Sequence, residues 1–212
     1  MASKTSLFDL PNELFPYFLQ YLSSIDIFKA FSDIQSDRLQ TLIGPFLTAI
    51  DLTKESEQWI QSNLSEFSRR KAIRALRIEL NHLALIPDDL FSIGIQSMEV
   101  INPDHELHCS EQIMLRLRQN LKKLTLTSHV ADEIEYEAVQ FLRSDSQLTH
   151  LTINSCVRFY SDTPMEISTR LTYLSIALDG MKLVFTLLTH LPNLRQLKVI
   201  TKMNHIDSPL RS

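Results

Sequence analysis

One short apolar phrase recurs along most of the chain and limits what the chain can fold into. In its clearest copy, polar residues separate Leu148, Leu151 and Ile153, and Cys156 follows three residues later. The same order of apolar and polar residues begins again at six other positions: Leu47, Ile73, Ile95, Leu121, Leu171 and Leu194. The copies at positions 47 and 95 are weaker. Each phrase ends in an apolar–polar alternation, which predicts a strand with one buried face.

The spacing and consensus of these phrases resemble those of leucine-rich repeats. Successive starts lie 26, 22, 26, 27, 23 and 23 residues apart, within the roughly 20–29 residue period of that family. Asn81 and Cys156 occupy the position where the family has Asn or Cys, and we expect both to turn the chain rather than to react. The resemblance covers residues 47–212. It implies an α/β fold: a curved solenoid with parallel strands on its concave face.

The connectors between the phrases indicate helices on the opposite side. Apolar residues at helical spacing predict helices over 55–67, 132–142 and 181–191, and a further helix capped by Ser110. Residues 86–91 are expected to form a turn or a single helical turn. Residues 157–169 show no regular pattern.

The first part of the chain, residues 7–46, has a different pattern. Leu14, Phe18 and Leu22 recur at i and i+4, which indicates an amphipathic helix that ends at Ser23. Ser23 and Asp26 have capping-box spacing for a second helix, and Ser36 can cap a third. Three short helices cannot bury so many large apolar side chains alone, so we expect the repeats or a partner to cover one face.

These residues resemble an F-box. Leu10-Pro11-Asn12-Glu13-Leu14, then Tyr21-Leu22-Ser23, then Asp26-Ile27 follow the order of that family's motif. The resemblance implies that the segment docks on a Skp-type adaptor, which links it to a cullin in a ubiquitin ligase. It maps the docking surface onto six residues: Leu10, Pro11, Leu14, Phe18, Leu22 and Ile27.

Two features depart from the F-box pattern. The family often has a Trp late in the motif, where this chain has only Arg38 and Leu39. Pro16 also lies within the expected first helix. Because proline lacks an N–H and clashes with the carbonyl four residues back, the helix must begin near Asn12 or kink.

Composition excludes several classes of protein. The 212 residues carry a net charge of −4, which gives no electrostatic case for nucleic-acid binding. Two cysteines are too few for a disulfide framework. We expect a cytoplasmic or nuclear protein, because the chain shows neither a signal-peptide pattern nor a membrane-length apolar run. Only three glycines occur and they do not cluster, which argues against a phosphate-cradling loop.

The sequence gives little support for a catalytic or metal-binding site. His105, His108 and Cys109 are close in sequence, but they lack the spacing and the further ligands of a zinc site. The acids between Asp132 and Glu137 indicate a solvated helix face rather than a catalytic pair. We therefore expect no enzyme activity, no metal and no cofactor, and a small hydrolase or metal enzyme is the weakest hypothesis.

The sequence favours a substrate-recognition subunit of a Skp–cullin–F-box ligase, with the F-box at 7–46 and the repeats at 47–212. A repeat scaffold without a ligase role is the alternative. The target should contact outward strand residues, with Tyr173 as the best anchor: Arg77, Glu99, Lys123, Thr125, His150, Thr152, Tyr173, Ser175, Gln196 and Lys198. Residues 171–212 hold five basic and two acidic residues, which points to an acidic protein partner more than to nucleic acid. We expect neither nucleic acid nor a membrane among the partners.

Overall fold

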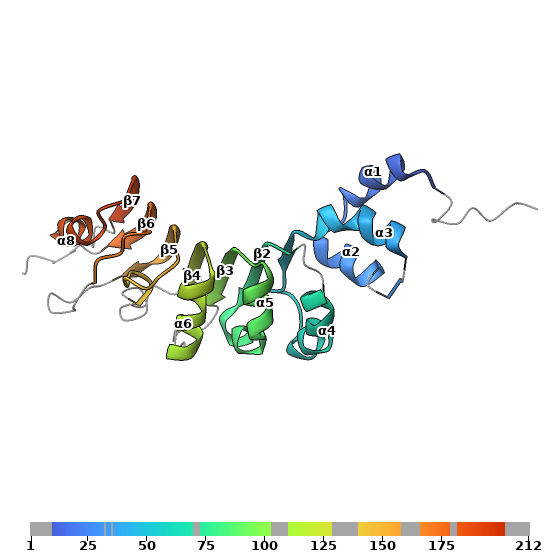
Figure 1. Cartoon of the computed structure of the whole chain (residues 1–212), viewed down its shortest axis with the longest axis horizontal. Coiled ribbons are helices and arrows are strands. Elements are labelled where there is room, and N and C mark those ends of the chain that lie inside the picture. Colours follow the sequence, from blue (N-terminus) through green and yellow to red (C-terminus); the bar gives the residue numbers. More distant parts are fainter. Residues whose placement is uncertain are drawn as a thin grey trace, which may run out of the picture.

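The computed structural model describes residues 10–31, 33–34, 36–69, 73–102, 110–128, 140–157, 166–178 and 182–201. Over these ranges the chain is a mixed α/β protein whose seven strands form one parallel sheet in sequence order (Figure 1). The strands are β1 Ala49–Asp51, β2 Ala75–Glu79, β3 Ser97–Asn102, β4 Lys123–Ser128, β5 His150–Val157, β6 Tyr173–Leu178 and β7 Gln196–Thr201. The prediction of a strand in each of the seven phrases is confirmed, including the two weaker copies.

The register of the sheet follows the phrase. Every strand begins at the third position of its copy, so the second apolar residue of each copy aligns across the sheet. This row is Ile50, Leu76, Met98, Leu124, Leu151, Leu174 and Leu197. A shift of one residue would move the apolar set of a strand to the exposed face, so the alternation fixes the pairing.

A repeated backbone hydrogen-bond pattern joins each phrase to the next. The carbonyl oxygen of Thr48 accepts from two consecutive N–H groups, those of Arg74 and Ala75, at 2.8 and 3.0 Å. The same two-to-one pattern recurs at each later step, with the carbonyl oxygens of Arg74, Gln96, Lys122, Thr149 and Thr172 as acceptors. Each unit is therefore held to its neighbour by the same contacts, which keeps all the strands parallel.

Helices cover the apolar side of the sheet. They are α4 Glu57–Arg69, α5 Asp88–Ile93, α6 Glu111–Asn120 and α8 Lys182–His190, with the 3₁₀ helix η4 at Leu80–Leu85. Figure 1 shows α4, α5 and α6 side by side along the strands. The predicted helices at 55–67, after Ser110 and at 181–191 are thus confirmed, and the helical turn expected within 86–91 is the short helix α5. Ser110 caps α6 as expected, because its Oγ accepts from the N–H of Ile113 at 3.3 Å.

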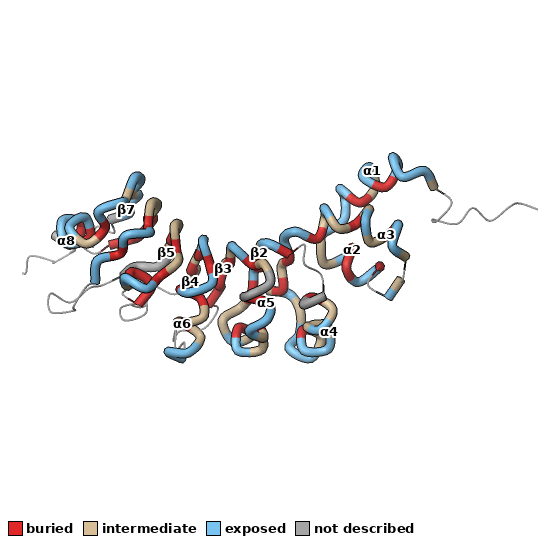
Figure 2. The backbone as a smooth tube through the Cα atoms, viewed as in Figure 1, coloured by how far each residue is buried: buried red, intermediate tan, exposed pale blue. Residues whose placement is uncertain are grey.

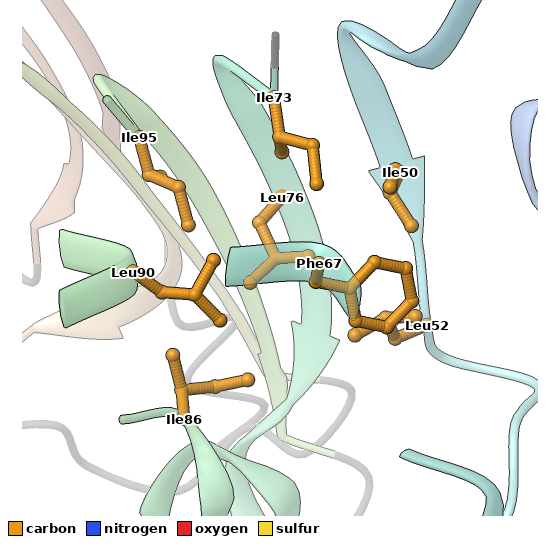
Figure 3. A pocket seen from close by; sticks show the side chains of 8 residues that line it. All are labelled: Ile50, Leu52, Phe67, Ile73, Leu76, Ile86, Leu90 and Ile95. Atoms are coloured by element: carbon orange, nitrogen blue, oxygen red, sulfur yellow. The ribbon is translucent and has the colours of Figure 1, made fainter. Parts of the chain in front are cut away.

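The core between the sheet and the helices is mainly apolar. Near its N-terminal end, only aliphatic and aromatic side chains surround a void of about 10 Å³ (Figure 3): Ile50, Leu52, Phe67, Ile73, Leu76, Ile86, Leu90 and Ile95. A water molecule needs two to four polar partners, and this lining offers none. The void is a dry packing defect rather than a ligand site.

The N-terminal helices consist of η2 Asn12–Leu14, α1 Phe15–Leu19, α2 Ser24–Phe31, α3 Asp37–Ile43 and η3 Gly44–Leu47. The helical turn starts at Asn12, and Pro16 lies in the first turn of α1, where its missing N–H costs little. The expected cap at Ser23 is confirmed. The N–H of Asp26 donates to Ser23 Oγ at 3.1 Å, and that hydroxyl donates to the Asp26 carboxylate at 2.6 Å.

An aromatic cluster joins the N-terminal helices to the sheet. The ring of Phe28 on α2 lies 4.5 Å from Phe67 and 6.0 Å from Trp59 on α4. Lys29 Nζ reaches Glu55 Oε1 at 2.7 Å and lies 4.9 Å from the Trp59 ring. One continuous hydrophobic core runs through both parts, so the two segments expected at 7–46 and 47–212 are in direct contact.

Asn81 and Cys156, the two residues expected to turn the chain after a strand, have different outcomes. Asn81 is the second residue of η4, where the chain leaves the sheet after β2. The expected turn at Cys156 is wrong, because β5 continues to Val157. A register shift between Ile153 and Cys156 accommodates extra residues in β5, and Cys156 then pairs with Ala177. The predicted helix at 132–142 lies, except for its last three residues, outside the described residues.

Candidate protein-binding surfaces

An apolar surface remains exposed on the N-terminal helices, and we name it the helical apolar surface. It consists of Leu14, Tyr17, Tyr21 and Leu22, whose exposed fractions are 44%, 68%, 82% and 42%. Figure 2 shows exposed residues around α1, at the end of the molecule far from β7. The alternate side of the same segment points inward, with Phe15 and Leu19 almost fully buried. The segment from Leu14 to Leu22 therefore has two apolar sides, and only the side of Phe15 and Leu19 is fully buried in the core.

The structure places five of the six expected adaptor-binding residues at or beside this surface. Leu14 and Leu22 belong to it, and Pro11 is exposed. Leu10 and Phe18 are half-buried, packed against the core.

The sixth residue, Ile27, is 1% exposed and belongs to the core. The Ser23 cap starts α2 in an orientation that turns Ile27 and Phe28 inward. The expected docking set is therefore corrected at this position, because a buried side chain cannot contact a partner directly.

Arg38 fastens the segment that leads into the helical apolar surface. Its Nε donates to Asn12 Oδ1 at 2.8 Å, and its Nη2 donates to the Leu10 carbonyl oxygen at 2.5 Å. The guanidinium also lies 5.8 Å from the centre of the Phe15 ring, a cation–π distance. Sequence reasoning noted Arg38 only as a departure from the F-box pattern. Its contacts cross 26 and 28 residues of chain, so no local signal reveals them.

The second candidate surface is the outward face of the sheet, which we name the sheet face. The register aligns the expected target-binding residues in two rows across neighbouring strands. One row contains Lys123, His150, Tyr173 and Gln196, and the other contains Arg77, Glu99, Thr125, Thr152, Ser175 and Lys198. All of them are exposed or half-buried except Ser175, which is 5% exposed. The structure thus brings all ten residues onto one face.

Charges on strands β1–β3 pair with one another. Arg77 Nη1 lies 3.1 Å from Asp51 Oδ2, and Arg77 Nε lies 3.3 Å from Glu99 Oε2. An open hollow of about 280 Å³ lies over these strands, and Asp51, Arg77 and Glu99 are part of its lining. The sequence analysis did not identify Asp51 as a residue of the sheet face. Asp51 joins the row of Arg77 and Glu99 only through the parallel register of β1 with β2.

The electrostatics of Asp51 follow from its contacts. Partial burial raises the pKa of its carboxyl, but hydrogen bonds from the Thr53 hydroxyl and N–H, and from Arg77, outweigh that effect. The net pKa of Asp51 lies below its ordinary value. In return, the hydrogen bond with Asp51 and the charge of Glu99 raise the pKa of Arg77. The three side chains form a charge ladder in which Asp51 and Glu99 flank Arg77 and more than neutralise its positive charge.

Strands β5 and β6 present an aromatic pair. The rings of His150 and Tyr173 are stacked, with their centres 5.6 Å apart and their planes at 23°. His150 Nδ1 lies 2.9 Å from Thr149 Oγ1, and that hydroxyl donates to the Lys122 carbonyl oxygen at 3.0 Å. The ring pair is thus held on the sheet face by neighbouring backbone as well as by packing, which makes it a pre-organised contact area.

The described ranges contain neither a metal-ligating cluster nor a membrane span. Within them, no group of three or more metal-ligating residues comes together, and His105, His108 and Cys109 lie outside the described residues. None of the described helices combines the length and apolar character needed to cross a bilayer.

Comparison with known proteins adds no assignment. No protein-family model matches the chain, and no curated protein matches it.

Proposed function

We propose that this protein is the substrate-recognition subunit of a Skp–cullin–F-box ubiquitin ligase. In this proposal the N-terminal helices are an F-box bundle that docks on a Skp-type adaptor. The sheet with its helices is a leucine-rich-repeat solenoid that binds a target protein. The observation that carries the proposal is the helical apolar surface, which the rest of the described chain leaves exposed.

The composition of the helical apolar surface supports a protein partner. Burial of apolar area contributes about 25 cal/mol per Å², and Tyr is enriched among residues that dominate binding energy. Leu14 and Leu22 flank the two tyrosines, and each of the four residues is more than two-fifths exposed. Because Phe15 and Leu19 already supply the core, the outer residues are free to be used for docking.

The regularity of the sheet supports the solenoid part of the proposal. Parallel strands in sequence order, one per phrase, with the same backbone contacts at each step, agree with units that bury their leucines only against neighbours. The sheet face, lined by side chains between those leucines, is the surface that such an array offers to a target.

Such a subunit acts by proximity and forms no bond itself. Holding a target beside the ligase raises the effective concentration of the target's lysines at the ubiquitin-conjugating enzyme. The junction of Phe28, Trp59 and Phe67 favours this role. A packed aromatic junction keeps the two binding surfaces at a constant separation. A flexible linker would let the distance between the target and the ligase vary.

The proposal is tested by co-elution of the chain with a purified Skp-type adaptor in size-exclusion chromatography. The double variant Leu14→Asp/Leu22→Asp should elute apart from the adaptor, because both charged groups would be buried without partners. Phe185→Asp/Leu188→Asp on α8 is the matched control. These two apolar residues are exposed to a similar extent, 69% and 46%, and this variant should co-elute. If the folded wild-type chain elutes alone, the proposal is wrong, and the repeat scaffold without a ligase role takes its place.

A further inference from the structure

The sheet face is electrically asymmetric. Strands β1–β3 carry three acids, Asp51, Glu79 and Glu99, whereas strands β4–β7 carry neither Asp nor Glu. Lys123 on β4 and Lys198 on β7 are both exposed. The C-terminal half of the sheet face is therefore basic and hydroxyl-rich in a chain whose net charge is −4.

The two lysines differ from Arg77 in how their charge is used. Arg77 is neutralised by Asp51 and Glu99 in its own row. Neither Lys123 nor Lys198 forms an ion pair with any residue that the structure describes. Among the described residues, the positive charge on strands β4–β7 is thus not offset by any acid, and it can pair with an external group.

The aromatic pair lies between these charges. His150 and Tyr173 continue the row that begins at Lys123, one residue on each following strand. Lys198 lies in the other row, on the strand after Tyr173. A path across the sheet therefore meets a cation, two stacked rings and a second cation in turn.

The dimensions of this path suit an extended peptide. Strands β4 and β7 are three inter-strand spacings apart, about 14 Å, and the two rows are offset by two residues, about 7 Å. The path from Lys123 to Lys198 is therefore about 16 Å in length, which an extended chain covers with about five residues. Carboxylates at the two ends of such a segment would each meet a lysine.

We propose that strands β4–β7 of the sheet face bind an extended acidic segment of a partner protein. Asp or Glu side chains at the two ends of a segment of about five residues, which point to the same side of an extended chain, pair with Lys123 and Lys198. An apolar or aromatic side chain between them packs on the His150–Tyr173 rings. The inference rests on the proposed function only in treating the owner of this segment as the target of the ligase.

Selection from a display library of random dodecapeptides on the full-length chain tests this inference. The selected peptides should be enriched in Asp and Glu. The dissociation constant of a fluorescently labelled selected peptide should rise by at least about tenfold in Lys123→Glu/Lys198→Glu. It should also rise when the salt concentration is increased. Lys54→Glu makes the same type of replacement at one exposed residue beyond β1, with half the total change of charge, and should leave the dissociation constant unchanged.

Three outcomes overturn the inference: no peptides are selected, the selected peptides show no acidic excess, or Lys123→Glu/Lys198→Glu binds them as well as the wild type. Circular dichroism of both charge variants establishes that they are folded. The adaptor test separates this inference from the proposed function, because Lys123→Glu/Lys198→Glu should still co-elute with the adaptor. If the chain binds acidic peptides but does not bind the adaptor, the result supports the sheet-face site and refutes the ligase role.

Discussion

Replacement of Leu151 by alanine should destabilise the whole sheet. Leu151 is fully buried near the start of β5 and lies in register between Leu124 and Leu174. Truncation removes most of a buried leucine side chain and leaves a cavity that neighbouring strands cannot close. Such changes cost about 2–5 kcal/mol, and we expect about 3 kcal/mol here. The neighbouring Thr152 lies half-buried on the opposite face, and Thr152→Ala should cost at most about 1 kcal/mol.

Urea denaturation followed by circular dichroism measures both changes. With an m-value of about 2–3 kcal/mol per M, the midpoint of Leu151→Ala should fall by about 1 M. The midpoint of Thr152→Ala should move by a small fraction of that. Equal shifts for the two variants would refute the register, because they would mean that β5 does not separate a buried face from an exposed one.

Three smaller perturbations test other contacts. Ser23→Ala should lower the free energy of unfolding by about 1 kcal/mol in a denaturant titration, because it removes the cap of α2 and the bond to Asp26. Arg38→Ala should weaken adaptor binding more than Arg38→Lys in a titration with labelled adaptor, because only lysine can still reach one of the two acceptors. The lowered pKa of Asp51 means that its contribution to stability is present above the unfolded-state value and is lost as the pH falls through the folded-state value, below about 3.8. When the free energy of unfolding is measured as the pH is lowered, Asp51→Asn should therefore lose less stability than the wild type below that pH.

The strands were predictable because the period of the phrase and the alternation within it are both local. A copy such as the one at Ile95 is weak in sequence, yet β3 forms there because its neighbours on both sides have the same register. The caps at Ser23, Ser36 and Ser110 were predictable for the same reason, since each depends on residues within one helical turn. The alignment of the target-binding residues in rows also follows from local alternation combined with parallel pairing.

Features that depend on distant parts of the chain were not predictable. The i, i+4 pattern identified Leu14, Phe18 and Leu22, but it could not say that Phe15 and Leu19 would supply the core instead. The burial of Ile27 depends on how α2 packs, which its own segment does not encode.

The extension of β5 through Cys156 has a similar origin. It depends on pairing with Ala177 of the next strand, whereas the consensus position alone predicts a turn. The ladder of Asp51, Arg77 and Glu99 likewise needs three strands in register before any of its contacts exists.

Docking of the helical apolar surface on a Skp-type adaptor is measured most directly by isothermal titration calorimetry with the purified adaptor. We predict saturable binding by the wild-type chain, with a negative change in heat capacity that reports apolar burial. The dissociation constant should rise by at least about 100-fold in Leu14→Asp/Leu22→Asp and stay unchanged in Phe185→Asp/Leu188→Asp. Equal affinity in the wild type and Leu14→Asp/Leu22→Asp, with both folded, would contradict the claim that this surface is the docking site.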